Sequence, residues 1–134
     1  MYSKFQKYLA DRNIPYRLGQ GANGKPIIRI INGIANTNVS AAYVIFFGKG
    51  DITIQGTDIC LNFPHSFAGY ELLNGLNHEY RYCRFFVPEN HSLKVQIDLG
   101  IVSVPSEEEI FSHLMLMTKI VDDVFPRIMR VAKG

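Results

Sequence analysis

The sequence predicts an α+β fold in which helices pack on a twisted antiparallel sheet of about five strands. Between residues 26 and 63 the turns that separate the apolar segments are too short for the crossover that parallel strands require. A helical pattern at 66–80 leads into a hairpin at 81–99, and a long amphipathic pattern begins at Ser106. The predicted order is therefore a helix, a meander of about four strands, a helix, a hairpin and a final helix.

The first half of the chain supplies the first helix and the meander. Residues 3–13 repeat apolar side chains at helical spacing, and residues 16–18 can form a short strand. Asn23-Gly24 favours a hairpin turn because both residues tolerate a positive φ angle. The following strands are predicted at 26–33, at 40–47 and, as one strand interrupted or bent at Gly56, at 51–55 and 59–63.

The second half begins with a helix that has Ser66 as its candidate N-cap. We expect Asn74 and Asn77 on this helix to serve structure, by hydrogen bonding the adjoining loop or strand. In the hairpin, residues 92–99 alternate cleanly between apolar and polar side chains. Ser106 and Glu109 form a capping box at the start of the last helix. Pro126 lies inside that helix and predicts a kink or a break.

Composition and charge exclude several classes of protein. The 134 residues are predicted to form one domain, 1–134, and the net charge of +2 comes without a basic run, which argues against nucleic acid. No window approaches the roughly 20 apolar residues of a membrane span, and the first residues lack the apolar core of a signal peptide. Cys60 and Cys83 lack CxxC spacing and are expected to be reduced thiols. We therefore expect a cytoplasmic protein with no membrane partner.

The residue types of common active sites are present but not in catalytic patterns. The four histidines (His65, His78, His91 and His113) do not have metal-ligand spacing, so no metal is expected. The glycine-rich segment 19–25 lacks the GK[ST] ending of a phosphate loop, so no nucleotide cofactor is expected. Neither a nucleophile motif nor a catalytic residue is predicted.

The apolar face of the last helix is wider than packing against a single sheet requires. Its apolar residues cover an arc of roughly 240° on a helical wheel, whereas a helix on one side of a sheet needs roughly 100°. Either the other helices cover the excess, or it meets another subunit or a client protein. For the second case the candidate interaction surface is Phe111, Met115, Met117, Ile120 and Val124.

The layout resembles the YbjN family, bacterial proteins described as sensory transduction regulators, whose domain has the type III secretion chaperone-like fold. The resembling segments run almost end to end, and they are 14–16, the turn 23–24, 73–77, 85–87, 93–99 and 122–129. Segment 73–77 looks like the family's Leu-x-x-x-Asn element, and 122–129 is similar to its closing helix with a proline. This chain lacks the strong acidic charge of many members. The resemblance implies a cytosolic bacterial protein without enzymatic activity or a catalytic site.

Two functions from different classes follow as hypotheses. The first is a non-enzymatic domain that binds a protein partner in a chaperone-like or regulatory role, as a homodimer. The second is a small-ligand or metal-dependent enzyme that uses His78, Cys83 and Asp98 across the junction of helix and hairpin. An enzyme needs a polar pocket with convergent titratable groups, and a binding module shows a broad apolar groove.

Overall fold

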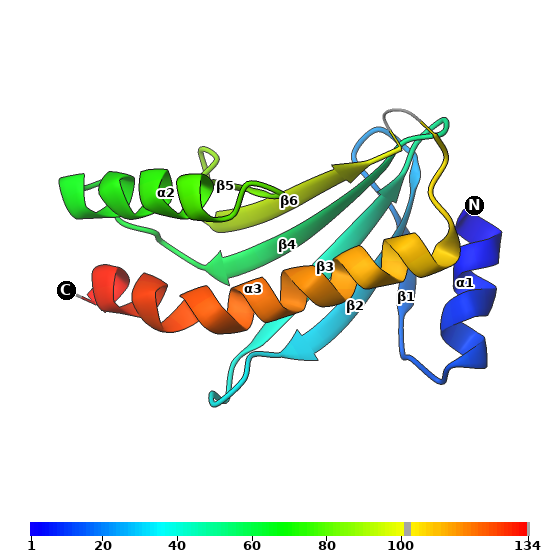
Figure 1. Cartoon of the computed structure of the whole chain (residues 1–134), viewed down its shortest axis with the longest axis horizontal. Helices are drawn as coiled ribbons and strands as arrows, with labels where there is room; N and C mark the ends of the chain where they lie inside the picture. The colour runs from blue at the N-terminus through cyan, green and yellow to red at the C-terminus, as the bar shows by residue number, and fades with distance from the viewer. Residues whose placement is uncertain (101–102, 134) are drawn as a thin grey trace.

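The computed structural model describes residues 1–100 and 103–133, and Figure 1 shows their arrangement. Within these residues the chain forms three helices and six strands. In order they are α1 (Tyr2–Asp11), β1 (Arg17–Gln20), β2 (Pro26–Gly33), β3 (Ser40–Phe47), β4 (Ile52–Cys60), α2 (Phe67–Glu79), β5 (Arg84–Phe86), β6 (Leu93–Leu99) and α3 (Glu107–Lys133). The predicted α+β class and the predicted order of elements are confirmed.

All six strands belong to one sheet with the order β1-β2-β3-β4-β6-β5, and every pair of neighbours is antiparallel. The sheet has six strands instead of about five because both short segments, β1 and β5, pair fully with a neighbour. The hairpin joins the meander through its second strand, so β6 lies next to β4 and the three-residue β5 forms the edge. The structure places no helix between the strands of the meander, in keeping with its short connections.

The expected irregularity in the fourth strand is present as a change of register. β4 is continuous from Ile52 to Cys60, and its pairing with β6 shifts between Gly56 and Cys60. Gly56 faces the core, where an added Cβ would lie 2.8 Å from Cγ1 of Val95. A side chain at this position would therefore collide with the neighbouring strand, since real Cβ contacts are longer.

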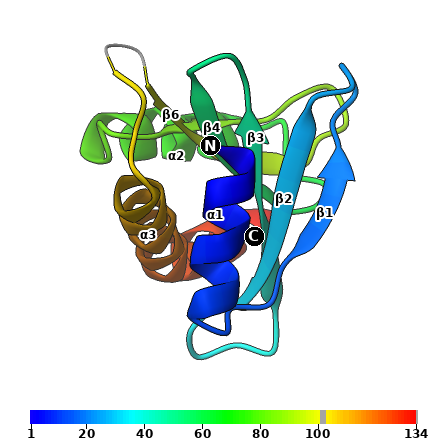
Figure 2. The ribbon, with the colours of Figure 1, turned by 90° about the vertical axis from the view of Figure 1, so that its right-hand side faces the viewer.

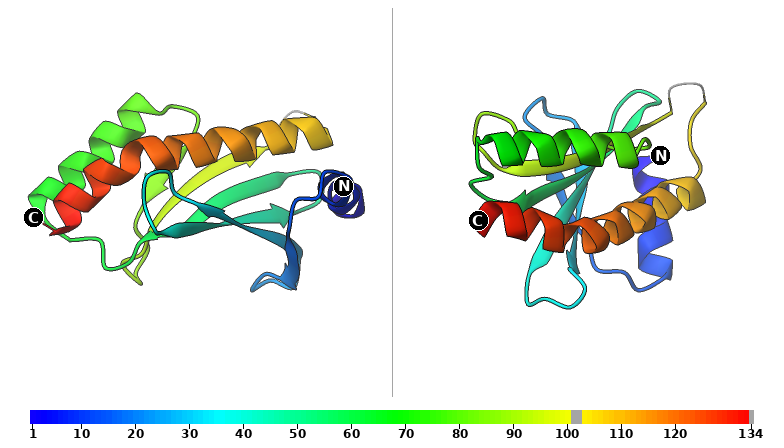
Figure 3. Two further views of the ribbon diagram at one scale, coloured as in Figure 1. Left: turned by 90° about the horizontal axis from the view of Figure 1, so that it is seen from below. Right: turned by 60° about the vertical axis from the view of Figure 1, so that its left-hand side comes forward.

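The helices pack against one face of the sheet. α3 crosses this face diagonally, α1 covers one end and α2 lies near the other, as the view from below shows (Figure 3). Figure 2 shows α1 beside the first part of α3, where it also contacts β2. The strands direct alternate apolar residues into this layer, among them Ile28, Tyr43 and Ile54, each of which is at most 1% exposed. The hydrophobic core lies between the sheet and the three helices.

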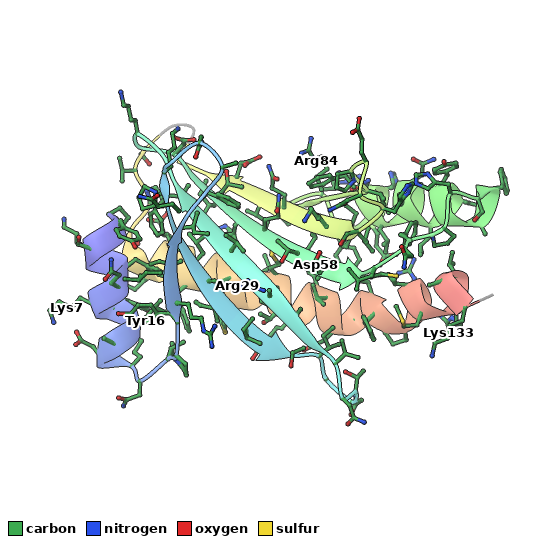
Figure 4. All side chains as sticks on the ribbon, turned by 180° about the vertical axis from the view of Figure 1, so that it is seen from behind. Lys7, Tyr16, Arg29, Asp58, Arg84 and Lys133 are labelled. Atoms are coloured by element: carbon green, nitrogen blue, oxygen red, sulfur yellow. The ribbon has the colours of Figure 1, made fainter. Side chains whose placement is uncertain are left out.

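Within the described part of the chain, no helix lies on the other face of the sheet (Figure 4). Its neighbouring strands β4 and β6 are joined across this face by side chains: Thr53 Oγ1 donates to Asp98 Oδ1 at 2.8 Å, and Gln55 Nε2 donates to Gln96 Oε1 at 3.1 Å. Arg29, labelled in Figure 4, lies on the same face. This face is therefore polar and solvated along β4 and β6, as expected of an antiparallel sheet covered on one side.

The predicted capping box begins α3. Ser106 Oγ accepts from the Glu109 amide at 3.2 Å, and the Glu109 carboxylate accepts from the Ser106 amide at 3.3 Å. The helix continues through Pro126 to Lys133 instead of breaking there. Its axis bends over the last third, where the ribbon passes from orange to red (Figure 3, left). A bend at this position fits the lost hydrogen bond and ring clash of an internal proline.

Candidate protein-binding surface

Most of the wide apolar arc of α3 faces the core of the chain itself. Met117 and Val124 are fully buried, and Ile120 is 7% exposed. These three residues were expected on an interaction surface, and the structure corrects this expectation because α3 contacts the sheet, α1 and α2 at once. At Met117 and Val124 the other elements cover the excess, so these side chains are not accessible to a partner of the folded chain. Ile120 keeps a small exposed fraction and lines the larger of the two hollows described below.

Phe111 and Met115, the two other residues of the expected surface, are only half-buried. The Phe111 ring packs against Tyr8 of α1, with the ring centroids 5.6 Å apart. Phe111 and Met115 also line a hollow of about 250 Å³ between α3 and the segments around Ile14 and Ile31. Ile30 and Leu114 also line this hollow, which is therefore apolar. Because Phe111 and Met115 keep part of their surface exposed, the hollow is open to solvent.

A second hollow lies on the opposite flank of α3, towards the segment that joins α2 to β5. Its volume is about 420 Å³, and its lining includes Tyr80, Tyr82 and Leu116. Tyr82 is 82% exposed and Leu116 is 38% exposed, large fractions for apolar side chains. At one end the carboxylate of Glu79 forms an ion pair with Arg127 of α3 at 3.0 Å, which ties α2 to α3.

Leu116 and Met115 therefore separate two apolar hollows on the outer side of α3. We call Phe111, Met115, Leu116 and Tyr82 the α3 surface. Such a ridge between two hollows can accept apolar side chains of a partner on both sides. The Tyr80 hydroxyl donates to Asp123 of α3 at the border of this surface, and burial, followed by this hydrogen bond, raises the pKa of Tyr80.

The exposed Leu116 was not among the residues expected on the interaction surface, whereas the buried Met117 was. Leu116 belongs to the stripe of Ser112, Lys119 and Asp123, which are all exposed, whereas Met117 lies one residue further round the helix. An apolar residue inside a polar stripe was the available signal for Leu116. No comparable signal exists for Tyr82, because its exposure depends on how the loop after α2 is folded.

The alternative catalytic group of His78, Cys83 and Asp98 is not assembled. His78 and Asp98 are exposed, whereas Cys83 is buried. Desolvation raises the pKa of the Cys83 thiol to about 11. Asp98 points to the open face of the sheet, where it accepts from Thr53. Because neighbouring positions in a strand alternate between faces, Cys83 on the helix-covered side cannot meet it.

Asn77 has the structural role expected of it, and Asn74 does not. The Asn77 amide donates to the Phe85 carbonyl at 3.0 Å and accepts from the Phe85 amide at 2.7 Å. The Asn77 side chain thereby satisfies the outward-facing backbone groups of Phe85 in the edge strand β5, as a further strand would. The Asn74 side chain is exposed and makes no such hydrogen bond within the described part of the chain.

Both cysteines are free and buried, and burial raises the pKa of each thiol. Neither thiol is therefore activated as a nucleophile. In residues 1–100 and 103–133 we find no helix that combines the length and hydropathy needed to cross a bilayer.

Comparison with known proteins finds similarity among solved structures. No family model and no curated protein matches the sequence. Among solved structures, the chain is similar to one titled "Crystal structure of YbjN, a putative transcription regulator from E. coli", with a TM-score of 0.65 and 10% sequence identity, over 95% of this chain and 93% of that chain. At this identity the similarity concerns the fold. The comparison thus confirms the fold expected from the sequence resemblance: this chain has the fold of YbjN over nearly its whole length.

Proposed function

We propose that this protein is a non-enzymatic regulatory domain that binds another protein through the α3 surface. The observation that carries the proposal is the exposure of Leu116 and Tyr82 on either side of a hollow of about 420 Å³. Exposed apolar side chains that gather around a hollow are typical of an interaction site, whereas single exposed apolar residues are normal on a surface. The similarity in fold to a protein described as a regulator supports the same class of function.

The chemistry of the chain agrees with a binding role. Its two thiols are buried, with raised pKa values, and the three residues of the enzyme hypothesis lie apart. Free buried thiols also suit a reducing compartment, and we therefore place the protein in the cytoplasm.

The first partner to test is a second copy of the chain. Two copies related by a two-fold axis would use the same α3 surface twice, so each substitution counts twice in the dimer. Leu116 is 38% exposed in the single chain, and this exposed area would be buried in the dimer. Leu116→Glu would lose this burial and would bring a carboxylate out of water at the interface. We expect it to weaken the free energy of dimerisation by about 1 kcal/mol per subunit. This corresponds to about 2 kcal/mol per dimer, or about 30-fold in the dissociation constant.

Sedimentation velocity over a wide range of concentration tests this proposal. The wild-type chain should show a reversible dimer, and Leu116→Glu should weaken it while circular dichroism stays unchanged. Ala132→Glu is the matched control, because it places the same charge on an exposed position of α3 several turns away. A wild-type chain that stays monomeric throughout would contradict self-association, and equal weakening by both substitutions would contradict the α3 surface as its site.

A further inference from the structure

Two histidines that are 26 residues apart meet beside the end of the sheet. His65 lies in the segment between β4 and α2, and His91 lies in the turn between β5 and β6. Nε2 of His65 and Nδ1 of His91 point at each other in direct contact. The two ring centroids are 4.3 Å apart and the rings are perpendicular, at 89°. The spacing of the histidines along the sequence does not indicate this pair.

The backbone on both sides fixes the position of the pair. The Phe63 amide, two residues before His65, donates to the His91 carbonyl at 2.8 Å, which joins the two segments directly. The His91 amide donates to the Pro88 carbonyl at 2.9 Å and closes the turn. His91 itself has a φ of 64°, a conformation that residues other than glycine seldom adopt. The turn therefore holds His91 towards His65 despite a backbone cost.

The two facing nitrogens must share either a hydrogen or a metal ion. Two lone pairs in contact would repel, and two N–H groups would clash, so either one proton or one metal ion must lie between the rings. On the far side of His65, Nδ1 is 2.9 Å from the Tyr70 hydroxyl oxygen. When Nδ1 carries the proton and donates it to Tyr70, Nε2 presents its lone pair to His91. A histidine that ligates a metal is held in this way by a hydrogen bond from its other nitrogen.

We propose that His65 and His91 form a two-histidine site for a divalent transition-metal ion that prefers nitrogen ligands, such as Zn²⁺, with Tyr70 as the residue that orients His65. Metal–nitrogen bonds of about 2.0–2.1 Å require the two nitrogens to be about 3 Å apart, so both exposed rings need to turn only slightly. Among the described residues no third His, Cys, Asp or Glu completes the group. Water therefore fills the remaining positions, and the ion exchanges with solvent.

The site also has a defined neighbour of negative charge. Ser92, which follows His91, is 2% exposed, and its hydroxyl donates to Asp58 Oδ1 at 2.8 Å. Asp58 is labelled near this end of the sheet in Figure 4. Because this carboxylate is hydrogen-bonded to the residue that follows His91, it adds negative charge near the pair, which favours a cation there.

Calorimetric titration of the chain without a histidine tag, with Zn²⁺ and in parallel with Mg²⁺, tests the proposal. We expect one Zn²⁺ per chain and no heat from Mg²⁺, which prefers oxygen ligands. His65→Ala and His91→Ala should each abolish binding, and Tyr70→Phe should weaken it by about tenfold, the lower end for loss of an orienting partner. His78→Ala is the matched control, because it removes another exposed histidine on α2, and it should bind as the wild type does.

A second readout separates loss of the site from loss of the fold. Zn²⁺ should raise the thermal midpoint of the wild type and of His78→Ala, but not of His91→Ala, while circular dichroism without metal stays the same for all three. Absence of Zn²⁺ binding by the wild type would show that the pair shares only a proton and would overturn the proposal. Equal binding by His91→Ala, or equal loss in His78→Ala, would overturn it as well.

Discussion

Replacement of Asn77 by Ala should destabilise the fold more than any other exposed substitution on α2. The Asn77 side chain satisfies both the N–H and the C=O of Phe85, a residue that is 2% exposed. Its removal deletes two hydrogen bonds and leaves two backbone groups of β5 without partners, beside a buried ring. A lost hydrogen bond of this kind costs about 1–3 kcal/mol when its partner stays unsatisfied. Because water can reach part of this edge strand, we expect about 2–4 kcal/mol in total.

Urea unfolding followed by circular dichroism measures this free energy. Asn74→Ala is the matched control, one turn earlier on the same helix, and it should change stability by less than about 0.5 kcal/mol. Asn77→Asp gives a sharper test, because its carboxylate can accept from the Phe85 amide but repels the Phe85 carbonyl. Only the protonated acid can donate to that carbonyl, so the pKa of this acid is raised in the folded chain. Relative to the wild type, the stability of this variant should be greatest below about pH 4 and should fall as the pH rises above it. If Asn77→Ala costs no more than Asn74→Ala, the account of β5 is refuted.

The remaining predictions concern the sheet, a cap and a thiol. Gly56→Ala should destabilise by about 1–3 kcal/mol in urea unfolding, because its Cβ would lie 2.8 Å from Val95 Cγ1, and full stability in this variant would contradict the close packing. Ser106→Ala should cost about 1 kcal/mol by thermal unfolding, since it removes the acceptor of the Glu109 amide; no change would show that the cap contributes nothing. Burial raises the pKa of Cys83 from 9.0 to about 11, so the folded chain keeps a proton that the unfolded chain loses. Stability should therefore decline between about pH 9 and pH 11, and the decline should be smaller in Cys83→Ala when both are followed by urea unfolding.

The sequence predicted the parts of the fold that depend on local patterns. The bounds of β2 and β3 are those expected, because isoleucine- and aromatic-rich segments were bounded by clear turn residues. The capping box at Ser106 and the N-cap at Ser66 are confirmed, with Ser66 Oγ accepting from the Gly69 amide at 3.1 Å. Each of these features needs only residues that are close in the sequence.

Other features depend on partners that are distant in the sequence. β5 has three residues, and its position at the edge is set by its register with β6, in which Phe85 pairs with Val95. Which strand of the hairpin joins β4 is likewise decided by pairing and not by strand propensity. Local patterns cannot supply such information.

The candidate site was predicted only in part for a related reason. A helical wheel gives the width of an apolar arc, but it does not say which elements cover it. Met117 and Val124 are covered by the rest of the chain, while Leu116, in the polar stripe, is left exposed. The contact of His65 with His91 depends on the path of two loops and has no pattern in the sequence.

Site-specific photo-crosslinking tests most directly whether the α3 surface binds protein. A benzoyl-phenylalanine is introduced at Leu116, at Met117 or at Ala132, and the chain is irradiated in the cells that naturally make it. Leu116 is 38% exposed beside the hollow, Met117 is fully buried, and Ala132 is exposed at the far end of the helix. The account predicts a discrete protein adduct from position 116, with a second copy or with another protein, and none above background from position 132. The variant at position 117 should fail to fold or should give no adduct. Adducts of equal yield from 116 and 132, or no adduct from 116, would contradict the assignment of this surface.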